Sequence, residues 1–150
     1  MKAVVQRVKY ASVTVDHLVV GKIDQGLLIL LGVQEGDVQD DLEWLAGKIS
    51  KMRIFSDAEG KMNLAVQEVQ GRVLVVSQFT LHALVKKGNR PSFIKAARPE
   101  KAIPLYEYFI KKCESELGKK CKSGIFGADM KVELVNDGPV TVFVDSKERE

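Results

Sequence analysis

The sequence predicts an α+β fold in which antiparallel sheets form a barrel-like core with two amphipathic helices. Several segments alternate between apolar and polar residues, with the period of two that is typical of half-buried strands. Two longer segments instead repeat apolar residues every three or four positions, as amphipathic helices do. The chain has 150 residues and no linker or internal repeat, so we expect residues 1–150 to form a single domain.

The first third of the chain is strand-like. AVVQRV, SVTVD and LVVGKID alternate between apolar and polar residues, whereas GLLILLGV is apolar throughout. We expect consecutive antiparallel strands here, with a tight hairpin between the second and third segments. GLLILLGV should lie in the centre of the sheet, because it offers apolar side chains to both faces.

An amphipathic helix is predicted next. DVQDDLEWLAGKISKMRIF carries acidic residues at its start and basic residues at its end, as the helix macrodipole favours. A polar turn, SDAEGKMN, then leads to the strongly apolar strand GRVLVVSQFTL. That strand changes to polar residues at Ser77.

The second half repeats this order of helix and strand. A basic loop, HALVKKGNRPSF, precedes an amphipathic helix that we expect from about Glu100 to Gly118. The chain then closes with two strands, KVELV and VTVFVD, joined by a turn-like NDGP. Proline removes a donor from a strand ladder and glycine has no side chain to pack, so NDGP breaks the strand pattern.

Composition excludes several classes of protein. The longest apolar run, residues 27–33, is much shorter than the roughly 20 residues that span a bilayer. Charges at Lys2 and Arg7 interrupt the apolar residues at the N-terminus, so we expect no signal peptide. Cys113 and Cys121 have neither CxxC spacing nor clustered histidines beside them, so we expect no metal ion and no cofactor. Two reduced thiols indicate the cytoplasm. The net charge of +3 permits a polyanionic partner without requiring one.

Two segments could carry chemistry. Ser77, Gln78 and Thr80 emerge beside Phe79 at the end of an apolar strand, where catalytic groups are often displayed. Such residues also end strands in proteins without any activity, by bonding to nearby backbone groups. NDGPVT can likewise be an ordinary β-turn. The pattern alone leaves both interpretations open.

Together, the two segments resemble the signature pair of the D-aminoacyl-tRNA deacylases, the family also called D-tyrosyl-tRNA deacylases. SQFTL and GPVT match without a departure, and weaker blocks follow in the family's order: MKAVVQRV, SVTVD, GLLILLGV, KISKMRIFSDAEGKMN, RPSF and GIFGADM. The resemblance implies a homodimer that hydrolyses the ester between tRNA and a D-amino acid, or glycine mischarged on alanine tRNA. The catalytic positions that it implies are Ser77, Gln78, Phe79 and Thr80, opposite a cis Gly138–Pro139 pair of the partner chain.

The residues of these motifs favour a substrate-assisted reaction. Neither motif contains a histidine, carboxylate or lysine that could activate the Thr80 hydroxyl. His82 would share the strand face of Thr80 if the strand continued, and His17 should be exposed in the first hairpin. We instead expect the neighbouring 2′-hydroxyl of the RNA to activate water, while N–H groups around Phe79 and Thr80 stabilise the oxyanion. Rigid backbone carbonyls at Gly138–Pro139 would then select the D configuration.

Basic and apolar residues outside the motifs are candidates for binding RNA. Acceptor-stem phosphates could contact Lys86, Lys87 and Arg90, together with Lys119, Lys120 and Lys122. Phe126 and Met130 could line a pocket for the terminal adenosine, although core packing is an equal alternative, and Arg7 could brace the Gly-Pro segment. The rival hypothesis is a nucleic-acid-binding protein without catalysis. A small-molecule esterase or amidase would need a nucleophile–base pair that this sequence does not offer.

Overall fold

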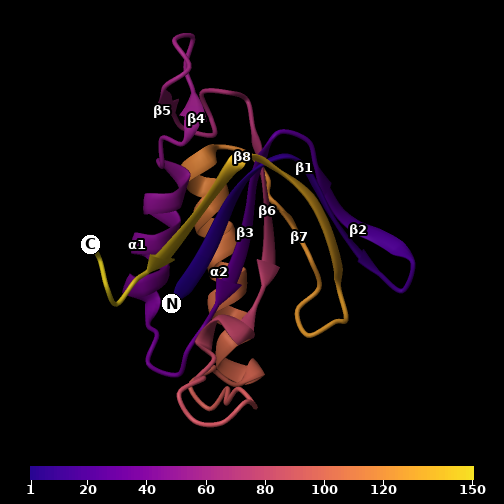
Figure 1. The fold of residues 1–150 in the computed structure, drawn as a ribbon, viewed down its shortest axis with the longest axis vertical. Helices are drawn as coiled ribbons and strands as arrows, with labels where there is room; N and C mark the ends of the chain where they lie inside the picture. The colour runs from indigo at the N-terminus through magenta and orange to yellow at the C-terminus, as the bar shows by residue number, and fades with distance from the viewer.

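The computed structural model describes all of residues 1–150 (Figure 1). Its elements in chain order are β1 (Lys2–Val15), β2 (Leu18–Ile23), β3 (Gly26–Gly32), α1 (Gln39–Ser50), β4 (Phe55–Ser56), β5 (Met62–Leu64), β6 (Arg72–Ser77), the short 3₁₀ helix η1 (Phe79–His82), α2 (Pro99–Leu117), β7 (Lys122–Ser123) and β8 (Lys131–Asp145). Both predicted helices are confirmed.

The sheet is mixed and nearly closed into a barrel, which confirms the barrel-like core but corrects its strand directions. Its order is β2-β1-β3-β6-β7, and β8 pairs with the other edge of β1. β1 runs antiparallel to β2, β3 and β8, whereas β3 and β6 are parallel, as are β6 and β7. The long excursion through α1 between β3 and β6 is the crossover that a parallel pair requires.

The N-terminal strands also differ from prediction. AVVQRV and SVTVD are not two strands but the single strand β1, whose first half pairs with β3 and whose second half pairs with β2. The predicted hairpin between β1 and β2 is present, and its turn residues Asp16 and His17 have φ angles of 47° and 65°. β3 lies between β1 and β6 and is almost wholly buried, so its predicted central place is confirmed.

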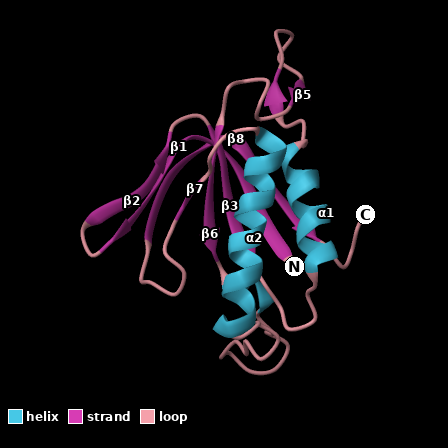
Figure 2. Ribbon diagram, turned by 180° about the vertical axis from the view of Figure 1, so that it is seen from behind, coloured by secondary structure: helices cyan, strands magenta, loops and turns pink.

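Both helices cover one face of the sheet (Figure 2). α1 buries Leu42, Leu45 and Ile49, and α2 buries Tyr106 and Phe109, in a core of 20 buried residues between helices and sheet. A second core of seven buried residues lies where β1, β2, β3 and β6 contribute side chains on the other side. No helix of the structure has both the length and the apolar composition needed to cross a membrane.

NDGP is not a turn between two strands. β8 continues from residue 131 to residue 145, and its pairing with β1 shifts register, because Val8 pairs with Asn136 while Gln6 pairs with Thr141. Residues 137–140 therefore stand opposite Arg7 alone. The proline and glycine are accommodated in a bulge, which is where strands tolerate them.

Candidate active site

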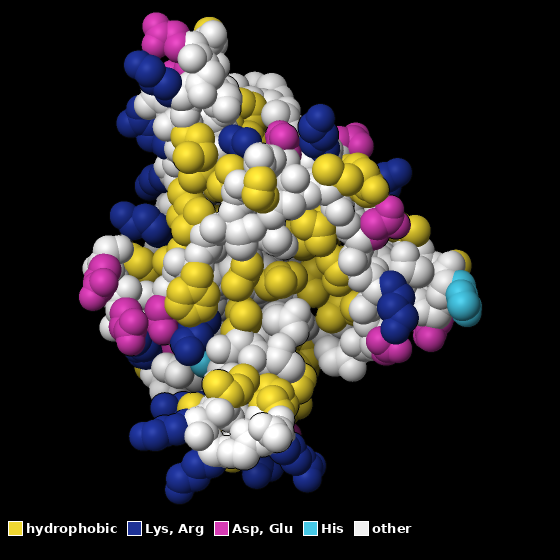
Figure 3. All heavy atoms as spheres, viewed as in Figure 1, with side chains coloured by type: hydrophobic (Ala, Val, Ile, Leu, Met, Phe, Trp, Pro, Cys, Tyr) yellow, Lys and Arg dark blue, Asp and Glu magenta, His cyan; other side chains and the backbone are white.

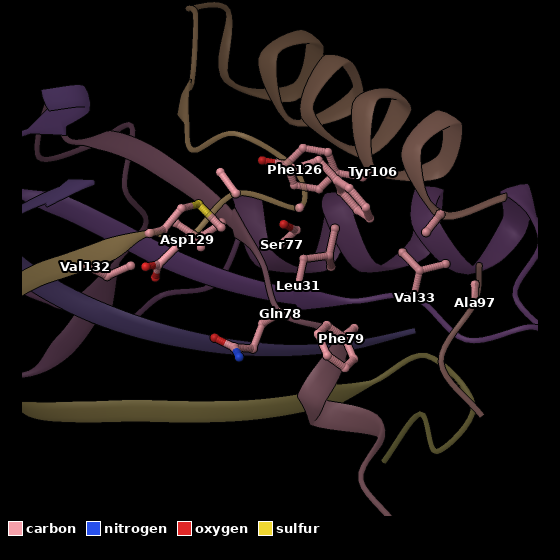
Figure 4. A pocket seen from close by; sticks show the side chains of 15 residues that line it. Leu31, Val33, Ser77, Gln78, Phe79, Ala97, Tyr106, Phe126, Asp129 and Val132 are labelled. Carbon is pink, nitrogen blue, oxygen red and sulfur yellow. The ribbon is translucent and has the colours of Figure 1, made fainter. Parts of the chain in front are cut away.

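A pocket of about 280 Å³ opens beside the carboxyl end of β6. Figure 4 shows the rings of Tyr106 and Phe126 on the side of α2, with Gln78 and Phe79 on the opposite side. Of the predicted site residues, Ser77, Gln78, Phe79, Phe126 and Met130 line the pocket. Phe126 also packs against the larger core and Met130 against the smaller one. Each of the two residues therefore lines the pocket and contributes to core packing.

The backbone after β6 leaves two N–H groups without an acceptor, those of Phe79, which lines the pocket, and of Thr80, which follows it and is not part of the lining. The strand ends at Ser77, where the predicted change to polar residues begins and four residues before the end of the predicted strand GRVLVVSQFTL, and the chain turns into η1 at Phe79. The first N–H groups of a helix have no acceptor within that helix. The turn and loop bonds of this segment come from the N–H groups of Gln78, Leu81 and Ala83, which leaves those of Phe79 and Thr80 free to bind an anionic oxygen.

Side chains at this place provide no base for Thr80. The Thr80 hydroxyl accepts a hydrogen bond from the Gln78 amide, whose nitrogen cannot take up a proton. Asp129 is the one charged residue among those that line the pocket, and its exposed carboxylate pairs with Lys131 at 3.1 Å. Burial raises the pKa of Tyr106 to about 12, and its hydroxyl donates to the carbonyl of Val75 at 3.1 Å. Tyr106 is therefore a neutral phenol that ties α2 to β6.

Neither histidine forms a hydrogen bond with the Thr80 hydroxyl. Because β6 stops at Ser77, the strand face that would have joined Thr80 and His82 does not exist. His82 instead ends η1 and is only 2% exposed, while Thr80 is bonded to Gln78. His17 is exposed at the β1–β2 turn, as predicted.

The Gly138–Pro139 segment is exposed and is held from behind. Its peptide bond is cis, as predicted. The guanidinium of Arg7 donates to the carbonyl oxygens of Asp137 and Ile54, each at 2.8 Å, which confirms that Arg7 braces this segment. The side-chain carbonyl of Asn136 accepts from the N–H of Val140 at 2.8 Å.

Gly138 has no room for a side chain. Its φ of 142° lies outside the range that other L residues favour. A Cβ there would stand 2.9 Å from the nitrogen of Val140 and 3.1 Å from Nη2 of Arg7. The backbone of the bulge is thus held by hydrogen bonds from two side chains, Arg7 and Asn136, and requires glycine at position 138.

The two motifs lie far apart within one chain. Ser77 of β6 pairs with Leu31 of β3, whereas Arg7 of β1, which lies behind the bulge, pairs with Leu27 of β3. Four residues of strand correspond to about 13 Å along the sheet, and three strand spacings from β8 to β6 add about 14 Å across it. Along the sheet, therefore, one copy of the chain does not bring the two motifs side by side.

The basic residues form two groups at opposite ends of the molecule. Figure 3 shows Lys and Arg side chains gathered at the lower end, where the loop after η1 lies. Lys86, Lys87 and Arg90 of this loop are exposed and make no ion pair. Lys119 binds the carbonyl of Gly71, just before β6 begins, and Lys120 pairs with Glu114 at 3.8 Å. Two lysines of the second group, Lys119 and Lys120, are therefore already bound to groups of the protein, and this group does not form one continuous surface with the first.

The cysteines are unpaired, and their surroundings disfavour the thiolate form. Burial raises the pKa of the Cys113 thiol and raises that of Cys121 to about 12. Three or more histidine, cysteine or acidic side chains gather nowhere in the chain in a way that could hold a metal ion. The polar groups that line the pocket are therefore backbone groups, the hydroxyls of Ser77 and Tyr106, the Gln78 amide and the Asp129 carboxylate.

Sequence reasoning missed the contribution to the pocket of α2, β3 and the residues next to them. Tyr106, Ala97, Ala102, Leu31 and Val33 all line it. Their apolar periodicity predicts burial, which is correct, but it carries no sign of a cavity. The FGADM segment was the only local signal, since it places an aromatic ring and a methionine among small residues.

The fold occurs in other solved proteins. A solved structure described as a probable eukaryotic D-amino acid tRNA deacylase shares it with a TM-score of 0.80 at 18% identity, over 96% of this chain and 98% of the other. The family described as D-Tyr-tRNA(Tyr) deacylase matches residues 4–145, and this chain belongs to that family.

Similar proteins span the whole chain. D-aminoacyl-tRNA deacylases from Akkermansia muciniphila and Flavobacterium psychrophilum are 61% and 59% identical over 150 residues, which is 100% of both chains in each case. A solved structure named c-Myc DNA Unwinding Element Binding Protein is 42% identical with a TM-score of 0.90, over 97% of this chain and 98% of that one.

Proposed function

We propose that this chain is a hydrolase that cleaves the ester of D-aminoacyl-tRNA and releases the free amino acid and tRNA. The observation that carries the proposal is the pocket beside Ser77–Phe79, in a chain of this family. Two main-chain N–H groups there have no acceptor, and the one charged side chain of the lining, Asp129, is paired with Lys131. Residues 1–150 act as one catalytic domain in the cytoplasm. Glycine carried by alanine tRNA is a second substrate, because it has no side chain to exclude.

The reaction is substrate-assisted. A water molecule attacks the ester carbonyl and loses a proton through the adjacent 2′-hydroxyl of the terminal ribose. The N–H groups of Phe79 and Thr80 hold the oxyanion of the tetrahedral intermediate. As the carbonyl re-forms, the bond to the 3′-oxygen breaks and that oxygen takes up the proton. Gln78 holds the Thr80 hydroxyl and so fixes this segment.

A second copy of the chain completes the site. Its Gly138 and Pro139 face the pocket, and their carbonyls hold the α-ammonium so that an L side chain would run into backbone. The exposure of both residues and their distance from the Ser77–Thr80 segment of the same chain support this arrangement. Figure 3 shows apolar side chains across the middle of the sheet face, and Phe79, Val135 and Phe143 are 55%, 39% and 57% exposed, as a dimer interface requires.

The RNA extends from the pocket to the basic loop. Phe126 and Met130 contact the terminal adenosine, and Lys86, Lys87 and Arg90 neutralise acceptor-stem phosphates. None of these three side chains forms an ion pair with an acidic residue, which supports this role. An unpaired cationic side chain can bind a phosphate directly and displace the counterions condensed on the RNA.

A second candidate is a nucleic-acid-binding protein without catalysis. The 42% identical protein named for binding a DNA unwinding element is the observation that favours it. The paired assay decides between the two: purified protein should release D-amino acid from D-aminoacyl-tRNA and spare the L form. Binding without release would reject the deacylase, and equal release of both forms would reject the role of Gly138 and Pro139. A Pro139→Ala variant, assayed beside the wild type, tests that role directly.

A further inference from the structure

His82 is the one residue of η1 that is buried. Its ring is 2% exposed, and Nε2 has no hydrogen-bond partner. The ring packs on Gly32 at the end of β3, where an added Cβ would stand 3.1 Å from Cδ2 and 3.2 Å from Nε2. The same Cβ would stand 2.8 Å from the carbonyl oxygen of Gln78. Ring and carbonyl therefore enclose Gly32 together.

This contact is the one fully buried anchor of η1. The other restraints on the helix are the bond from the Gln78 amide to Thr80, the ring contact between Phe79 and Phe93, and a few backbone bonds. Gln78 donates to the carbonyl of Leu31 at 2.7 Å just before η1, and Ala83 donates to the carbonyl of Thr80 at 3.1 Å at its end. Phe79 at the start of η1 is 55% exposed. The placement of the Phe79 and Thr80 backbone therefore depends on how the His82 ring sits against β3.

The surroundings of the ring favour its neutral form. Burial is the main cause that lowers the pKa of His82, and the Met1 ammonium and Lys2 lower it further. The carbonyl of Gly32 and the carboxylate of Asp37 act in the opposite direction. An unfolded histidine titrates near 6.5, so below that pH the unfolded state binds more protons than the folded one. The stability that the buried ring contributes is thus present above about pH 6.5 and is lost as pH falls through the lower, folded pKa.

We propose that His82 is a positioning residue whose neutral ring anchors η1 on Gly32, and that protonation of this ring releases η1 and disables the donors of Phe79 and Thr80. The site would then lose activity in mild acid without any titrating group in contact with the substrate. The catalytic part of this inference rests on the proposed deacylase function. The structural part does not.

The structural part is tested on the wild-type protein alone. Amide hydrogen exchange is followed at pH 7.5 and at a pH low enough that the NMR shifts of the His82 ring show it protonated, and protection factors are compared after correction for intrinsic exchange. We expect the protection of the Leu81 and Ala83 amides to fall at least tenfold at the lower pH, while β3 amides change little. Equal protection of η1 at both values would overturn the proposal, and this measurement needs no variant that might misfold.

The catalytic part compares pH profiles of deacylation. His82→Leu removes the titrating group and keeps an apolar side chain of similar size, and His17→Asn is the matched control at the exposed histidine. The substrate's own pH dependence is common to all three proteins. Relative to His82→Leu, the wild type and His17→Asn should lose about tenfold in kcat/KM for each pH unit below the pKa of His82. Identical acid limbs in all three would overturn the proposal. A protein that binds tRNA but never turns it over would instead reject the deacylase function, and hydrogen exchange would still decide the role of His82.

Discussion

The Ser77–Thr80 segment and the 137–140 bulge both present backbone to the surface, but they are held in opposite ways. The bulge is fixed by side chains from outside it, since Arg7 and Asn136 bind its carbonyl and N–H groups. The Ser77–Thr80 segment is fixed mainly by the strand that precedes it and by the buried ring that follows it. One region is therefore rigid by cross-bracing, whereas the other keeps its N–H groups free for a ligand.

The difference teaches that motif residues can matter through their main chain rather than their side chains. In such a site, substitutions that alter the backbone should have large effects, and substitutions that remove only a side-chain hydroxyl should have small ones. The expected outcomes below separate these two kinds of change.

The largest effect is expected for Phe79→Pro. Proline has no N–H, and it is tolerated at the first position of a helix, so the substitution removes one donor with little cost to η1. Deacylation should slow about 100-fold to 1,000-fold, as when an oxyanion donor is removed. Single-turnover rates measure this. The control is Phe79→Ala, which loses the ring and its 5.2 Å contact with Phe93 but keeps the donor. Equal losses in both variants would show that the ring, not the N–H group, is required.

A loss of about 100-fold is expected for Gly138→Ala, because a displacement of about 1 Å in a positioning group costs that much. The new Cβ must displace Val140 or Arg7. Gly60→Ala is the matched control, since Gly60 also has a positive φ, 79°, but nothing lies within 4 Å of an added Cβ. Both variants carry backbone strain, and only the first should lose deacylation in the D-aminoacyl-tRNA assay. Similar rates for the two variants would argue against a role for the bulge.

A moderate effect is expected for the double variant Lys86→Ala, Lys87→Ala. Each lysine that neutralises a phosphate adds about one to the slope of log affinity against log salt. Between 50 and 200 mM salt the wild type should therefore lose roughly tenfold more tRNA affinity than the variant does. Filter binding measures this. Lys119→Ala, Lys120→Ala at the opposite end of the molecule should retain the wild-type slope, and a reduced slope there would place the RNA elsewhere.

The smallest effect is expected for Thr80→Ala. The Thr80 hydroxyl has no base beside it, and the backbone N–H of residue 80 survives the substitution. The variant should keep at least about one tenth of the wild-type rate. A loss of about four orders of magnitude, the scale seen when a catalytic-triad residue is removed, would make Thr80 a nucleophile and reject substrate assistance.

Local periodicity predicted the elements but not how they pair. The helix expected from about Glu100 to Gly118 is Pro99–Leu117, because its apolar spacing and closing glycine are local signals. The continuity of β1, the parallel pairing of β3 with β6 and the bulge in β8 all depend on contacts between distant segments. An alternating pattern does not specify a strand's partner or direction, so these features needed the structure.

The candidate site was predictable in its motifs and not in its cavity. Ser77 and Gly138 came from their resemblance to a family, and Arg7 was correctly expected behind the bulge. Tyr106 could not be recognised, because a tyrosine on the apolar face of a helix has the same sequence pattern whether it fills a core or walls a pocket. The burial of His82 depended on where β6 ends, which a continuing apolar pattern did not reveal.

Complementation between two disabled variants tests most directly whether the site is shared between chains. The Phe79→Pro chain lacks one N–H donor but has an intact bulge at residues 137–140. The Gly138→Ala chain keeps both N–H donors but has an altered bulge. After subunit exchange at equal concentrations, about half of the dimers should be hybrids, each with one fully wild-type site. The account predicts that the mixture recovers about a quarter of the wild-type deacylation rate, although each variant alone is nearly inactive. A mixture no more active than the two variants measured separately would contradict it.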